Sequence, residues 1–97
     1  MKTYTICGSM KFTKQMKEIA KRLEKDFTIL QCVYVDDISK LTKESILKLQ
    51  EDHYNKIDMS DGIYVVNIDG YIGESVKKEI EYAKNNNKEI IYFHNEK

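Results

Sequence analysis

Short apolar runs alternate with amphipathic segments along this chain, and that alternation constrains the fold more than any other feature. The runs are rich in β-branched and aromatic residues, which predicts strands over residues 3–7, 27–35, 61–67 and 89–93. Between them, apolar residues recur at helical spacing, which predicts helices over about 11–25, 42–57 and 75–85. Thr42 and Ser75 are the expected N-caps, and the asparagines from residue 85 to 87 the expected stop.

Strands that alternate with helices indicate a parallel sheet built from βαβ units. The prediction is a small doubly wound α/β sheet of about four strands and three helices, flavodoxin/Rossmann-like in architecture. Right-handed crossovers bring the carboxyl ends of all strands to one edge. Gly8-Ser9, Asp36-Asp37 and the loop from Asn67 to Ser75 should therefore share that edge, where open α/β sheets bind ligands.

The 97 residues suffice for a single domain over 1–97. A domain this small buries a modest share of its surface, which favours a homodimer. Lysine plus arginine and aspartate plus glutamate are balanced at 16 each, so neither nucleic-acid polymers nor anionic membranes are expected partners. No apolar run is long enough to span a membrane and no secretory signal is visible, so a cytoplasmic location is expected.

Cys7 and Cys32 fall in predicted buried strands and lack C-x-x-C spacing, so both are expected to be small core residues in a reducing compartment. The two histidines, His53 and His94, are far apart and show no metal-ligand spacing. The glycines form neither G-x-G-x-x-G nor a Walker loop. We therefore expect no metal and no cofactor, and a polar tail over His94–Lys97.

Glu79 is the leading candidate for chemistry. Its spacing from Val76 and Ala83 places it on the inward side of the third predicted helix, about one turn after the expected cap. A carboxylate there could attack an anomeric carbon or stabilise an oxocarbenium-like transition state. The alternative is a solvated glutamate that merely complements the helix dipole.

Three further features have a functional and a structural interpretation. Gly8-Ser9 and Ser75 suit a phosphate at helix N-termini, or are plain turns and caps. His53 lies on the apolar stripe of the second helix beside Asp52; the pair could supply a proton donor or a sugar-hydroxyl ligand, or His53 is a core histidine. Asp61 could contact a substrate or simply begin a strand.

Taken in order, these segments resemble the nucleoside 2-deoxyribosyltransferase family, including its deoxynucleoside 5′-monophosphate N-glycosidase branch. Cys7-Gly8-Ser9-Met10 is similar to the turn that follows the family's first strand. Ser60-Asp61-Gly62-Ile63-Tyr64-Val65 resembles its Ser/Ala-Asp-apolar strand, and Glu79-Ile80-Glu81-Tyr82-Ala83 its Glu-Leu-Gly-x-Ala helix start. The resemblance covers most of the chain.

The resemblance implies a retaining mechanism with Glu79 as nucleophile on a nucleoside or nucleotide. The family's leaving-group aspartate, eight positions before the strand aspartate, corresponds to His53, with Asp52 beside it. The corresponding substrate-binding positions are Gly8, Ser9, Met10, Asp61, Gly73 and Ser75.

The chain departs from the family at three places, the first being the leaving-group aspartate, which is shifted to Asp52 or replaced by His53. Glu81 replaces the helix glycine, and Gly70-Tyr71-Ile72-Gly73-Glu74-Ser75 replaces the usual Asp-x-Gly-Thr-type loop. Two alternatives to N-glycosidic cleavage or deoxyribosyl transfer therefore stay open. One is a non-catalytic nucleotide-binding or regulatory module on the same fold, and the other is a small structural homodimer.

Overall fold

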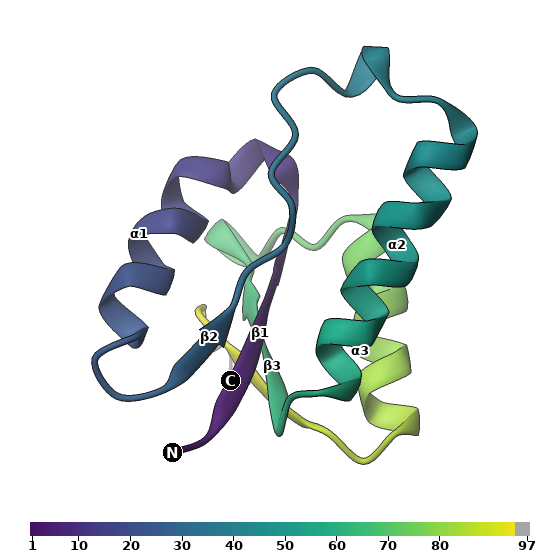
Figure 1. The fold of residues 1–97 in the computed structure, drawn as a ribbon. Coiled ribbons are helices and arrows are strands. Elements are labelled where there is room, and N and C mark those ends of the chain that lie inside the picture. The colour runs from purple at the N-terminus through teal and green to yellow at the C-terminus, as the bar shows by residue number, and fades with distance from the viewer. Residues whose placement is uncertain (95–97) are drawn as a thin grey trace.

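The computed structural model of the chain describes residues 1–94, and these form an α/β sheet of four parallel strands with three helices (Figure 1). The strands are β1 (Thr3–Gly8), β2 (Thr28–Leu30), β3 (Gly62–Val66) and β4 (Glu89–Tyr92), in the order β2-β1-β3-β4. The helices are α1 (Thr13–Leu23), α2 (Lys43–Asp58) and α3 (Glu74–Asn85). Short 3₁₀ turns are η1 (Met10–Phe12), η2 (Ile38–Lys40) and η3 (Ile68–Gly70). The predicted fold class is confirmed.

The sheet is covered on both faces, by α1 on one side and by α2 with α3 on the other (Figure 1). Each face of the sheet has its own hydrophobic core. Neighbouring residues of β1 pack in different cores because successive side chains of a strand point to opposite faces. Ile6 packs with Met16 of α1, whereas Cys7 packs with Ile57 of α2 and Val76 of α3. The molecule is thus doubly wound, as the sequence predicts.

The second strand is much shorter than predicted. Its pairing with β1 ends at Leu30, whereas the apolar run continues to Val35. Beyond Leu30 the chain leaves the sheet, and apolar residues such as Val35 and Leu41 line a cavity instead. Cys32 therefore lies in an irregular segment, half-buried, and the prediction that it belongs to a buried strand is wrong.

Helix ends are set by local capping. Thr42 caps α2 as predicted, since its side chain accepts a hydrogen bond of 3.0 Å from the backbone N–H of Ser45. Ser75 does not cap α3: Gly73 occupies the N-cap position and Ser75 lies in the first turn. Asn87 has a φ of 57°, the left-handed conformation expected after a helix end.

The strand order places a topological switch point between β1 and β3. From β1 the chain first crosses to β2 on one side, and the later connection returns to β3 on the other. Ligands of doubly wound sheets bind in the crevice at such a point.

No helix within residues 1–94 is long and apolar enough to cross a membrane. Of the predicted tail His94–Lys97, residues 95–97 lie outside the described part.

Candidate functional site

A cavity of about 570 Å³ opens at the carboxyl edge of the sheet, next to the switch point. Its volume is in the range of small-molecule sites. The turn after β1, the irregular segment after β2, one side of α2 and the start of α3 form its walls. Seven of the nine predicted site residues line it, namely Gly8, Ser9, Met10, His53, Gly73, Ser75 and Glu79.

Glu79 enters the cavity from the second turn of α3. The flanking positions Val76, Ile80 and Ala83 are buried against the sheet, so the helix presents Glu79 toward the interior as predicted. Its side chain is 16% exposed. One carboxylate oxygen, Oε1, lies 3.4 Å from Nε2 of His53. The carboxylate is therefore held in place by α2 yet open to the cavity.

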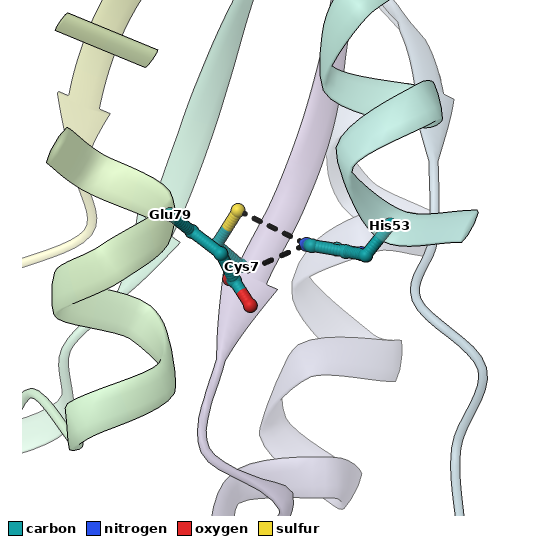
Figure 2. A group of neighbouring side chains, drawn as sticks. All are labelled: Cys7, His53 and Glu79. Atoms are coloured by element: carbon teal, nitrogen blue, oxygen red, sulfur yellow. Dashed lines mark hydrogen bonds and ion pairs between the residues drawn. The ribbon is translucent and has the colours of Figure 1, made fainter. Parts of the chain in front are cut away.

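His53 is the centre of a trio with Cys7, which is buried, and Glu79, which is partly exposed. Its Nε2 lies 3.3 Å from Sγ of Cys7 as well as 3.4 Å from Glu79. Figure 2 shows Cys7 from β1, His53 from α2 and Glu79 from α3 converging on one point. The other ring nitrogen, Nδ1, is buried without a hydrogen-bond partner among the described residues. His53 is thus neither a plain core histidine nor an exposed one.

The surroundings keep both thiols in their neutral form. Burial, with the negative charge of Glu79 as the second cause, raises the pKa of Cys7 well above its ordinary value. Burial likewise raises the pKa of Cys32 to about 11, and Glu79 again adds to the shift. Both cysteines are free thiols. Although the charge of Lys56 partly offsets the rise at Cys32, both pKa values are raised, so neither thiol is an activated nucleophile.

Another part of the cavity wall combines groups that suit an anion with the carboxylate of Glu74 in the first turn of α3. Gly73 caps α3 without a side-chain hydrogen bond, so the first-turn N–H groups are not capped by a side chain at that position. Lys11 also lines the cavity, and its Nζ lies 3.7 Å from the ring centroid of Tyr71. The hydroxyl of Ser9 accepts a 3.3 Å hydrogen bond from the backbone N–H of Lys11, which confirms a capping turn there.

Two predicted site residues lie elsewhere. Asp52 pairs with Lys56 at 3.2 Å, is half-exposed, and lines a neighbouring shallow hollow instead of the main cavity. One helix position separates its direction from that of His53 by about 100°. Asp61 precedes β3 at the opposite edge of the sheet, where Oδ2 accepts a 2.8 Å hydrogen bond from the backbone N–H of Thr3. Neither Asp52, predicted for catalysis, nor Asp61, predicted for substrate binding, lines the main cavity.

The sequence prediction also missed members of the site. Cys7 was assigned to the core alone, and no metal-ligating set was expected, yet the donor atoms of Cys7, His53 and Glu79 lie within 4.8 Å of one another. The sequence did carry a signal in the position of Cys7, which lies next to the last residue of β1, near the edge that also receives Glu79. Lys11, which also lines the cavity, was not singled out from the sequence.

No protein-family model, no curated protein and no solved structure matches this chain. What the site can do therefore rests on its own geometry. A largely shielded carboxylate at the wall of a cavity of about 570 Å³, with many apolar lining residues, is the feature that any function must explain.

Proposed function

We propose that this protein cleaves or transfers the N-glycosidic bond of a nucleoside or nucleotide, with Glu79 as the nucleophile. The observation that carries the proposal is the placement of the Glu79 carboxylate. It lies at the cavity wall, 84% shielded from solvent and held by His53. A positioned carboxylate of this kind is what covalent catalysis at an anomeric carbon requires.

The reaction would run in two displacements. A carboxylate oxygen of Glu79 forms a bond to the anomeric carbon while the bond from that carbon to the base nitrogen breaks, and the base nitrogen takes the electron pair and a proton. Water then attacks the same carbon, loses a proton and releases Glu79; a second base in place of water completes a transfer. Two inversions give net retention of configuration.

His53 serves as a positioning residue in this scheme. Its Nε2 faces Glu79 and Cys7, so the ring N–H can donate to the carboxylate and fix its direction. Nδ1 is buried, so neither nitrogen is directed at the space that a departing base would occupy. Asp52 points away from the cavity. The leaving base is thus proposed to take its proton from water.

The cavity walls support a nucleoside-shaped substrate. Apolar side chains including Met10, Val35, Leu41 and Tyr71 line the cavity and suit a planar base. Ser9 and the start of α3 suit the 5′ end of the sugar, either as a hydroxyl or as a phosphate.

Release of base from a panel of deoxynucleosides and deoxynucleoside 5′-monophosphates, measured by chromatography, tests the proposal. Glu79→Gln should lower the rate about a thousandfold or more, because the amide cannot act as the nucleophile. The matched control is Glu81→Gln on the same helix, at an exposed position. It should retain activity. Equal rates for Glu79→Gln and the unchanged chain would refute Glu79 as nucleophile.

A non-catalytic nucleotide-binding module is the second candidate. One reason is that the Glu79 carboxylate is paired with His53. A second is that Asp52 does not line the cavity, so the predicted aspartate is not placed to protonate a leaving base. Nucleotide binding measured by calorimetry, without base release on long incubation, would decide for this function.

The predicted homodimer and the predicted cytoplasmic location are also proposals. Val33, Ile38 and Ile46 line the cavity and are exposed, which supports a homodimer that covers them. Light scattering tests this, and a stable dimer that binds no nucleotide would favour a purely structural role. The free thiols Cys7 and Cys32 are compatible with the predicted cytoplasmic location.

A further inference from the structure

We propose that Cys7, His53 and Glu79 form a binding site for a thiophilic divalent cation, with Zn²⁺ as the best-fitting class. The trio offers one sulfur, one nitrogen and one oxygen ligand, all within 4.8 Å of one another. Cysteine, histidine and glutamate are established ligands of Zn²⁺. The thiolate selects such a cation over Mg²⁺ or Ca²⁺, which prefer oxygen-only sites.

Two of the three separations between the donor atoms match a tetrahedral ion, and the third is below 4.8 Å. Bonds of about 2.0–2.3 Å at tetrahedral angles put neighbouring ligand atoms about 3.3–3.6 Å apart. Sγ of Cys7 lies 3.3 Å from Nε2 of His53, and Nε2 lies 3.4 Å from Oε1 of Glu79. The three residues belong to β1, α2 and α3, which pack in one core. The ligands are therefore preorganised by regular elements (Figure 2).

The fourth position of such an ion would face the cavity. His53 and Glu79 both line the cavity, whereas Cys7 is fully buried behind them. Three protein ligands with one open position are the arrangement of zinc sites that admit water or a small molecule. Ions can therefore enter from the cavity without unfolding of the core.

Charge and proton balance favour a divalent ion. Binding displaces the thiol proton of Cys7 to solvent, so one thiolate and one carboxylate neutralise the two positive charges. His53 coordinates through Nε2 and then carries its proton on Nδ1. Since Nδ1 has no hydrogen-bond partner among the described residues, this change of tautomer breaks no hydrogen bond at Nδ1.

Metal binding and glycosidic chemistry would exclude each other. A Glu79 oxygen that coordinates an ion is not available to attack an anomeric carbon. Zn²⁺ should therefore inhibit base release, an inference that rests on the proposed function. The metal site itself does not depend on that function.

Titration of the full chain with Co²⁺, a spectroscopic substitute for Zn²⁺, tests the site without any nucleotide. One equivalent should produce a thiolate-to-cobalt charge-transfer band, and Zn²⁺ should abolish it whereas Mg²⁺ should not. Cys7→Ser should remove the band. Cys32→Ser, which alters the other free cysteine, should keep it. Glu79→Gln should weaken Co²⁺ binding at least about tenfold while circular dichroism shows an unchanged fold.

Three outcomes would overturn the site: no charge-transfer band in the folded unchanged chain, a band that depends on Cys32, or equal Co²⁺ affinity in Glu79→Gln. If Cys7→Ser does not fold, the Glu79→Gln affinity still decides. Base release is measured separately on chelator-treated protein. Failure of the metal site then leaves the glycosidase proposal standing, and failure of base release leaves the metal site standing.

Discussion

The two edges of the sheet use the same kinds of side chain in different ways. At the amino edge, Asp61 accepts a hydrogen bond from the backbone of Thr3, and Glu89 accepts hydrogen bonds from Tyr4 Oη at 2.7 Å and Lys2 Nζ at 3.1 Å. At the carboxyl edge, Glu79 faces a cavity. The acidic residues of the amino edge tie strands together, whereas Glu79 is held at a place that a ligand can reach.

The lysines of the two edges differ in the same way. Lys88 donates to the backbone carbonyls of Asp58 and Ser60, at 3.0 and 2.8 Å, and so holds the turn between α2 and β3. Lys11 lies over the ring of Tyr71 at the cavity. Structural and candidate functional positions are thus distinguished by the groups that a charged side chain contacts, more than by its residue type.

Replacing one carboxylate at each edge should affect different properties: base release at the carboxyl edge and folding stability at the amino edge. Glu79→Gln should reduce base release about a thousandfold or more and leave stability unchanged or raised, because site residues are seldom optimal for folding. Asp61→Ala should keep base release but lower the free energy of unfolding by about 1 kcal/mol, because it removes the acceptor for the Thr3 N–H. Chromatography and urea unfolding measure the two quantities.

The contrast between the edges fails if the two variants behave alike. A large activity loss in Asp61→Ala with stability unchanged would place the substrate contact where the sequence resemblance put it. A large stability loss in Glu79→Gln would make Glu79 a structural residue.

Replacement by alanine should cost more folding stability at Gly62, on the amino edge, than at Gly73, on the carboxyl edge. A Cβ at Gly62 would lie 2.4 Å from the backbone oxygen of Glu89, so Gly62→Ala forces β3 and β4 apart and should cost about 2–3 kcal/mol. A Cβ at Gly73 comes no closer than 3.6 Å to Tyr71, so Gly73→Ala should cost under about 1 kcal/mol. Urea unfolding compares the two, and equal costs would contradict this account.

The smallest expected effect is a pH dependence from the amino edge. Hydrogen bonds, first from Tyr4 and then from Lys2, lower the pKa of Glu89. Its stabilising contribution is therefore present above the pKa of the unfolded chain and is lost as pH falls through the lower folded value. The difference in melting temperature between the unchanged chain and Tyr4→Phe should shrink between about pH 6 and pH 3. A constant difference would contradict the Tyr4–Glu89 link.

Much of the fold could be predicted from local patterns. The element types, the parallel sheet and the capping role of Thr42 follow from periodicity and side-chain chemistry. The extent of β2 did not follow, because an apolar run has the same appearance whether it pairs in a sheet or lines a cavity. The start of α3 was misplaced because Gly73 and Ser75 are both acceptable near a helix N-terminus.

The site was predictable only in part. Residues that follow the strand ends, such as Gly8 and Ser9, reached the cavity because parallel topology sends all strand ends to one edge. Which of Asp52 and His53 lines the cavity depended on the angular position on α2, and the place of Asp61 outside the cavity depended on its hydrogen bond to Thr3 at the amino edge.

By itself, the sequence determined the alternation of strands and helices, the gathering of the strand ends at one edge and Glu79 as an inward carboxylate, because these depend on local periodicity and on chirality rules. Only the tertiary structure decided that Cys7, His53 and Glu79 meet at one point. They are separated by 46 and 26 positions in the chain and come from three elements. Their distances depend on how α2 and α3 pack on β1, which no local pattern encodes.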